Sequence, residues 1–295
     1  MRRLVILVVL FLVPLMVLAG PADETAKGPD TFATGPAARA TGGPDDFGYT
    51  FIDSTEAGGP VYGYEDISGT GTAAITGYAD DSVGGPFPIG FTFNFYGTDY
   101  TQFYVQTNGS IGFASFSYDY SNTCLPTTDL NGTFLAPLWD DLVCGSSGGA
   151  GGTIYYQTMG TAPNRYLVVQ FQGFRYIAGD ATDRIGFEVI LYEGSNDIVY
   201  QYADLTNGTS GHNGAVSATI GIQGDSGASP VHHLEYACNP GTELTVPLAV
   251  LFAPGVPPTP LATPVPGIPT VTPWGLAALL LTIAGVAVLL LRRRG

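Results

Sequence analysis

The sequence predicts an all-β protein, an antiparallel β-sandwich or jelly-roll-like domain with an N-terminal signal helix and a C-terminal transmembrane helix. Three observations support this class. The 295 residues include 41 glycines, 22 prolines, 17 tyrosines and 16 phenylalanines, a composition rich in turns and strand-forming rings. Apolar residues alternate with polar ones in short runs between residues 46 and 252, and helical patterns are sparse outside the two ends.

The N-terminal end reads as an export signal. Met1-Arg2-Arg3 precedes an apolar stretch from Leu4 to Leu18, and Val17-Leu18-Ala19 fits the small-residue cleavage pattern. We therefore expect a signal peptide over residues 1–19, with an uncleaved N-terminal anchor as the alternative. Residues 20–45 are small, polar and rich in Pro and Gly, which predicts a flexible leader.

Short strands are expected throughout residues 46–252. Phe91, Phe93 and Phe95 alternate with polar residues and define one apolar face. Asn108-Gly109, a strong hairpin signal, separates two apolar runs, and Glu193 to Asp197 separates two more. The predicted strands after Phe95 are Phe103–Thr107, Ser110–Phe113, Arg165–Phe171, Ile185–Tyr192, Ile198–Tyr202, Thr219–Gln223 and Leu248–Phe252.

The C-terminal end has an apolar run and arginines like the N-terminal end, in the reverse order. A proline-rich linker over residues 253–267 precedes an uncharged apolar run from Trp274 to Leu291 and three terminal arginines. At ~1.5 Å per residue that run spans about 27 Å, close to the ~30 Å hydrocarbon core. The arginines favour a cytoplasmic C-terminus. We expect a transmembrane helix over residues 274–291, in a terminal segment of residues 268–295.

This terminal segment contains a distinctive set of residues: Ile268, Pro269, Thr270, Trp274, Gly275, Arg292, Arg293 and Arg294. With these residues it resembles the IPTL-CTERM sorting signal, which is similar in layout to PEP-CTERM signals. The resemblance implies recognition by an exosortase-like membrane transpeptidase in a Gram-negative bacterium, which releases the protein or transfers it to the cell surface. Val271 and Pro273 depart from the usual Leu and acidic residue and leave the processing enzyme open. A plain anchor that is never cut is the alternative.

The middle of the chain contains five informative segments: Phe95-Tyr96-Gly97, Val105 to Gly109, Leu135 to Asp140, Tyr166 to Gln170 and Phe187 to Tyr192. Through these segments it is similar to nidogen-like extracellular domains and related bacterial surface modules. The resemblance implies a binding or structural module without an inherited active site.

Charge excludes one class of function. The two ends take five of the 10 basic residues, which leaves five against 25 acidic residues, a balance of −20 for the exported part. Such a surface repels nucleic acid and anionic lipid headgroups and suits a solvated outer-surface protein.

Three cysteines occur, and export permits a disulfide. Cys124 and Cys144 flank one segment and form the preferred pair, closing a loop worth about 3 kcal/mol in the chain-entropy model. Cys238 is then left over, although the sequence alone does not settle the pairing.

No catalytic motif is complete. Gly224-Asp225-Ser226-Gly227 matches the nucleophile motif of chymotrypsin-like proteases, but the only upstream histidine, His212, is too near, so an ordinary turn is expected. The adjacent His232 and His233 of a strand point to opposite faces and do not converge on a metal. We expect no enzymatic activity.

Acidic pairs are the best candidates for cation binding. Asp140 and Asp141, just after Trp139, and Asp80-Asp81 lie beside Gly-rich loops and could supply oxygen ligands to Ca²⁺. Neither pair has the spacing of a known calcium loop, so solvated turn carboxylates are the simpler interpretation. A glycosidase acid/base pair has no support from their spacing. Tyr118, Tyr120 and Tyr156 are candidates for stacking on sugars, and Asn108, Asn131 and Asn207 begin Asn-Gly-Ser/Thr sequons.

These patterns together predict an exported, non-catalytic bacterial surface or matrix protein. We expect it in the cell envelope, at the outer surface or outside the cell, and anchored in the inner membrane before processing. Its expected partners are an exosortase-like transpeptidase, the membrane through its C-terminal helix, and extracellular polysaccharide, but not nucleic acid. No cofactor is expected except Ca²⁺ in the first alternative, a calcium-assisted carbohydrate-binding adhesin. A secreted hydrolase is the second alternative.

Overall fold

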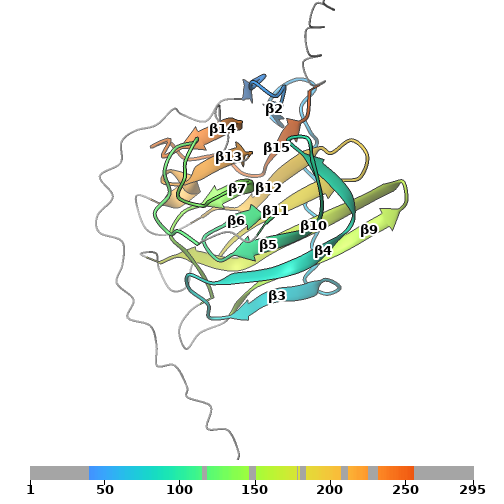
Figure 1. The fold of residues 1–295 in the computed structure, drawn as a ribbon. Helices are drawn as coiled ribbons and strands as arrows, with labels where there is room; N and C mark the ends of the chain where they lie inside the picture. Colours follow the sequence, from blue (N-terminus) through green and yellow to red (C-terminus); the bar gives the residue numbers. More distant parts are fainter. Residues whose placement is uncertain are drawn as a thin grey trace, which may run out of the picture. The chain divides into compact units, whose positions relative to one another are not determined.

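A computed structural model describes residues 40–114, 118–145, 151–177, 179, 184–206, 212–224 and 232–255. The predicted signal peptide, most of the leader and linker, and the sorting segment lie outside these ranges. Within them, no helix is long and apolar enough to cross a membrane. The all-β expectation is confirmed, because the described strands form two antiparallel sheets (Figure 1).

The larger sheet contains, in spatial order, β1 (Thr41–Gly42), β2 (Thr50–Asp53), β15 (Leu248–Ala253), β12 (Ile198–Asp204), β11 (Ile185–Tyr192), β10 (Asn164–Tyr176), β9 (Gly152–Thr161) and β3 (Thr72–Gly77), and β8 (Leu142–Cys144) pairs with the end of β10. The smaller sheet contains β14 (His233–Cys238), β13 (Thr219–Gln223), β7 (Phe134–Trp139), β6 (Ser110–Gly112), β5 (Thr98–Gln106) and β4 (Val83–Phe95). A short 3₁₀ helix, η1 (Asn213–Ala215), precedes β13.

The core lies between the two sheets. Alternate residues of each strand point inward, so that Phe93 of β4, Val189 of β11 and Val250 of β15 belong to one buried apolar cluster. Aromatic rings fill much of it, including the stacked pair Phe171 and Phe187, whose centroids are 4.5 Å apart.

Both outer faces also carry covering segments. Residues 54–71, here called the belt, connect β2 with β3 and therefore cross the outer face of the larger sheet from one side to the other (Figure 1). Residues 118–133, the cover loop, lie over the outer face of the smaller sheet, where Trp139 donates its Nε1–H to the Asp119 carbonyl at 2.7 Å. β7, which the cover loop covers from outside, is buried along its whole length.

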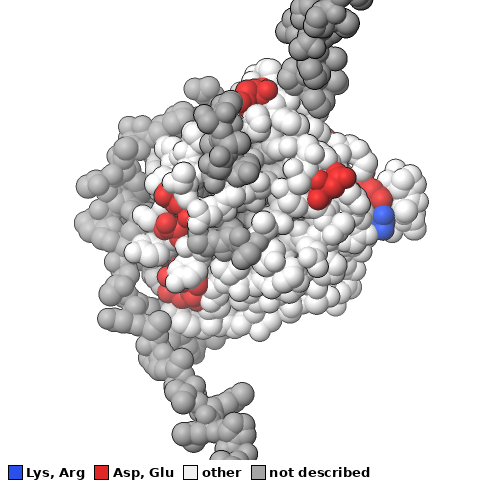
Figure 2. All heavy atoms as spheres, in the orientation of Figure 1, with Lys and Arg blue, Asp and Glu red and all other residues white. Residues whose placement is uncertain are grey.

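Acidic groups are distributed over the face of the molecule shown in Figure 2, and basic groups are scarce on it.

The β domain begins by Thr41, somewhat before the expected boundary at residue 46, because β1 pairs with β2.

Candidate functional site

The two acidic pairs predicted from the sequence meet at the turn between β5 and β6. Asn108, fully buried in that turn, donates from Nδ2 to Asp81 Oδ1 at 2.8 Å. Its Oδ1 accepts a hydrogen bond from the Leu142 amide at 3.1 Å, and its carbonyl accepts one from the Asp140 amide at 3.3 Å. Asn108 therefore ties the Asp81 loop to the turn between β7 and β8.

Asp140 is the centre of a buried polar network. Its Oδ2 accepts a hydrogen bond from Ser217 Oγ at 2.5 Å, and its Oδ1 accepts one from the Asp141 amide at 2.8 Å. His212 Nδ1 lies 2.8 Å from the same Ser217 Oγ, and its ring stacks on Tyr176 at 4.9 Å. Burial, and secondarily the charge of Asp140, raise the pKa of the Tyr176 hydroxyl.

This arrangement differs from a hydrolase triad. In a Ser-His-Asp triad the imidazole lies between the hydroxyl and the carboxylate. Here Ser217 lies between His212 and Asp140 and donates its hydroxyl hydrogen bond to the carboxylate, so the order of the three groups is not that of a triad. The network orders the turns at one end of the sandwich.

For calcium, the two oxygens of Asp140 already accept hydrogen bonds from protein donors. Among the described residues, one group of three or more potential metal ligands converges, formed by Cys124, Glu235 and Cys238. Two of those three ligands are joined in a disulfide. Calcium binding by Asp140 and Asp141 therefore stays a prediction.

The predicted Cys124–Cys144 disulfide is wrong. Cys124 is bonded to Cys238 instead, with a Cα–Cα distance of 5.3 Å. The cover loop places Cys124 beside β14 of the smaller sheet, whereas Cys144 belongs to β8 and pairs with β10 of the larger sheet. Cys144 is a free, buried thiol, and burial raises its pKa to about 12.

His232 and His233 do not converge on one point. His232 Nδ1 lies 2.7 Å from Asp46 Oδ1, and its ring stacks on Tyr96, whereas His233 is the first residue of β14. Of the protease-like motif, the structure describes Gly224; Asp225, Ser226 and Gly227 lie outside the described residues, as do Asn207 and every residue of the sorting motif.

The three tyrosines proposed for sugar stacking differ in their exposure to solvent. Tyr118 and Tyr120 are exposed, at 52% and 42%. Tyr156 instead packs against Phe87 and Phe103 at the edge of the core, which removes its ring from solvent contact on one side. Among the described sequons, Asn108 is buried and Asn131 is exposed.

The belt is held by a row of polar side chains that sequence reasoning missed. Gln201, Glu188 and Gln170 are cross-strand neighbours on β12, β11 and β10, on the outer face of the larger sheet. The Gly63 amide donates to Gln201 Oε1 at 2.7 Å, and Gln201 Nε2 donates back to the Gly63 carbonyl at 3.0 Å. The row continues with three bonds: the Glu65 amide to Glu188 Oε1 at 3.0 Å, the Ile67 amide to Gln170 Oε1 at 2.8 Å, and Thr70 Oγ1 to Gln157 Oε1 of β9 at 2.7 Å.

Glu188 is the unusual member of this row. It is fully buried, and its Oε1 accepts hydrogen bonds from the Glu65 amide and from Gln201 Nε2, while no hydrogen-bond partner for Oε2 is found among the described residues. Burial is the main reason that its pKa rises to about 8, and the charges of Glu65 and Asp66 add to the rise. The carboxyl is therefore mainly protonated at neutral pH.

Beside the belt lies a row of partly exposed side chains, here called the platform: Met159 of β9, Tyr166 of β10 and Tyr192 of β11. The strand register places the three directly opposite one another on the outer face. The rings of Tyr166 and Tyr192 stack with centroids 5.9 Å apart, and the Tyr166 hydroxyl lies 3.5 Å from Glu65 Oε2 of the belt.

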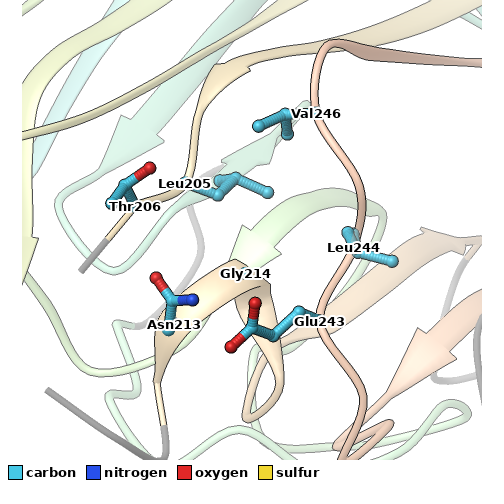
Figure 3. A pocket seen from close by; sticks show the side chains of 7 residues that line it. All are labelled: Leu205, Thr206, Asn213, Gly214, Glu243, Leu244 and Val246. Atoms are coloured by element: carbon cyan, nitrogen blue, oxygen red, sulfur yellow. The ribbon is translucent and has the colours of Figure 1, made fainter. Parts of the chain in front are cut away.

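A shallow depression occurs at another place, between η1 and the chain that leads to β15 (Figure 3). The residues that line it are Leu205, Thr206, Asn213, Gly214, Glu243, Leu244 and Val246. It is open to solvent and brings few convergent polar groups together, so it does not have the enclosed form of a typical small-molecule site.

Comparison with known proteins identifies the family. No curated protein and no solved structure matches the chain. The family model described as NIDO related matches residues 48–249, from just before β2 into β15. This is well over half of the chain and extends the likeness seen in the sequence to most of the sandwich. The chain belongs to the NIDO-related family.

Proposed function

We propose that this chain is an exported, non-catalytic protein of a bacterial surface or extracellular matrix, and that its β-sandwich acts by binding. The observation that carries the proposal is the NIDO-related match over residues 48–249, together with the Cys124–Cys238 disulfide. Disulfides persist in oxidising compartments outside the cytosol. The acidic balance of the exported part supports the same location.

The non-catalytic part of the proposal is supported by the buried polar network around Asp140. Ser217 lies between Asp140 and His212, an order that differs from that of a Ser-His-Asp triad. Asn108 uses its side chain to join two turns. A binding role requires an accessible surface and does not require these buried groups to react.

Surface display is tested by treating intact cells with a protease and mapping the fragments by mass spectrometry. Cleavage within residues 40–255 in intact cells supports display, and cleavage only after lysis contradicts it. A cytoplasmic protein of the same cells serves as the control for lysis.

The sorting step is a separate part of the proposal. An exosortase-like enzyme would recognise Ile268-Pro269-Thr270 with the helix and arginines that follow. Mass spectrometry of the mature C-terminus is expected to find a new end near this motif. An intact Arg294-Gly295 end on the mature protein would remove the sorting step and leave the binding domain unaffected.

A calcium-assisted carbohydrate-binding adhesin is the second candidate. It is favoured by one observation, the joining of Asp81 to the Asp140 turn through Asn108, which brings two acidic loops to one end of the sandwich. Loss of glycan binding in the presence of a calcium chelator is the result expected for this candidate.

A further inference from the structure

We infer that the platform of Met159, Tyr166 and Tyr192, bordered by Glu65 of the belt, binds an uncharged polysaccharide. The inference deepens the proposed function and rests on it, because it assigns the binding role to one surface and one class of polymer.

Three neighbouring strands build the platform. Tyr166 lies opposite Met159 on one side and opposite Tyr192 on the other, so the side chains form one row across the sheet. The tyrosine rings are 28° from parallel. Aromatic side chains in such a row present apolar surface and a polar hydroxyl together, which matches a sugar ring with its apolar C–H face and its hydroxyl rim.

The belt leaves this row partly exposed while it buries the next one. Val168, Ile190 and Val199 occupy the adjacent positions and are buried in the cluster that contains Ile67 of the belt. Tyr166 and Tyr192 pack against the same cluster but stay partly exposed. The platform therefore lies beside the belt, which borders it on one side.

That border carries a hydrogen-bond acceptor. The Glu65 amide is fixed on Glu188, and the exposed Glu65 carboxylate lies 3.5 Å from the Tyr166 hydroxyl. A carboxylate at the edge of aromatic rings can accept hydrogen bonds from adjacent sugar hydroxyls. Glu188 and Gln201 act as positioning residues, because they hold the belt backbone that presents Glu65.

Charge selects the kind of polymer. Glu65 and its neighbour Asp66 are both exposed and acidic. The arginine next to Tyr166 does not offset them, because Arg165 pairs with Glu193 at 2.5 Å and lies over the Phe91 ring. A polyanion would be repelled, and two copies of the chain meeting at this surface would bring like charges together. An uncharged chain of sugars meets neither obstacle.

The experiment is isothermal titration of the full-length protein with cellohexaose, xylohexaose and mannohexaose, and with an alginate hexamer as the anionic probe. At least one uncharged hexasaccharide is expected to bind, and alginate is not. Tyr166→Ala and Tyr192→Ala are expected to weaken that binding tenfold or more. Tyr166→Phe, which keeps the ring, is expected to bind within threefold of the parent.

The matched controls are Tyr118→Ala and Tyr120→Ala, which remove exposed tyrosines of the cover loop. Glu65→Ala changes an exposed belt residue and keeps the test open if a platform variant fails to fold; it is expected to weaken binding at least threefold. Thermal unfolding of each variant checks the fold.

Binding that survives Tyr166→Ala and Tyr192→Ala, or Glu65→Ala in a folded protein, overturns the platform. Loss of binding in the cover-loop variants alone places the sugar elsewhere and also overturns it, but leaves a binding function in place. Binding of alginate only, or of none of the four probes, overturns the inference. The proposed surface location is tested separately, by the protease mapping, and can fail without affecting this result.

Discussion

At the scale of single residues, Glu188 shows how one buried carboxyl is tolerated inside an apolar strand. Its neighbours in the strand, Phe187 and Val189, face the core, so Glu188 faces the belt. A charged carboxylate there would have lost its water without gaining a cation, which is why the protonated form is favoured and the pKa rises to about 8.

This shift makes stability depend on pH. Unfolded Glu has a pKa near 4.5, so between about pH 4.5 and 8 the folded state keeps a proton that the unfolded state has released. The contribution of Glu188 to the free energy of unfolding is therefore complete below pH 4.5 and is lost as pH rises through 8. Glu188→Gln is expected to flatten this decline, as measured by urea unfolding at pH 5, 6, 7, 8 and 9.

Glu193→Gln is the matched control for that series. The hydrogen bonds from Arg165 lower the pKa of Glu193 to about 2, so its titration lies below the tested range. A slope between pH 5 and 8 that is the same in the parent and in Glu188→Gln would show that Glu188 does not carry the effect.

At the scale of elements, the hairpin of β5 and β6 is the clearest case of a turn dictated by sequence. Asn108-Gly109 predicts it, and Gly109 adopts a φ of 76°. The same turn also approaches β7 so closely that a Cβ on Gly109 would lie 2.0 Å from the Leu138 carbonyl oxygen. The glycine is needed there for space as well as for conformation.

Gly109→Ala and Gly132→Ala separate these two reasons. Gly132 has a φ of 91°, and no described atom lies within 4 Å of the position that its Cβ would take. Gly132→Ala is expected to lower the free energy of unfolding by about 1–2 kcal/mol, the cost of the left-handed conformation. Gly109→Ala is expected to cost at least ~2 kcal/mol more, because Leu138 or the turn must move. Equal losses in urea unfolding would contradict the role assigned to the close approach.

Strands with one-sided alternation or a turn signal were predictable, as β4, β5 and β11 show. The strands that are covered on their outer face were harder to predict. β9 carries the polar residue Gln157 among its apolar ones because its outer face meets the belt there. β7 is buried along its whole length and shows no alternation. The belt itself has no periodicity, because side chains of the sheet hold its backbone. Its acceptors Gln170, Glu188 and Gln201 fall in one row only when the strand register is known.

At the scale of the whole molecule, the disulfide illustrates the same limit. Cys124 and Cys144 are close in sequence, but the strands that follow them belong to different sheets, and pairing in space joins residues 114 positions apart. The acidic pairs show the converse, since sequence identified Asp81 and Asp140 separately and the fold joined them through Asn108.

Non-reducing peptide mapping checks the corrected pairing. One peptide pair containing Cys124 and Cys238 is expected, with alkylation of Cys144 only after unfolding, because its thiol is buried. Cys124→Ser with Cys238→Ser is expected to lower the free energy of unfolding by about 4–5 kcal/mol in the chain-entropy model. Cys144→Ala should leave the bridge intact, and alkylation of Cys238 in the folded parent would contradict the assignment.

The pairing of β2 with β15 has a mechanical consequence. Thr50 lies opposite Ala253, and the Asp53 amide bonds the Ala40 carbonyl, so the two ends of the sandwich leave from neighbouring strands (Figure 1). A tensile force applied at these ends would act on β1, β2 and β15 and bypass the remaining strands. The bulk of the domain would lie to one side of the line of tension, so such a force would separate the terminal strands while the platform stayed folded.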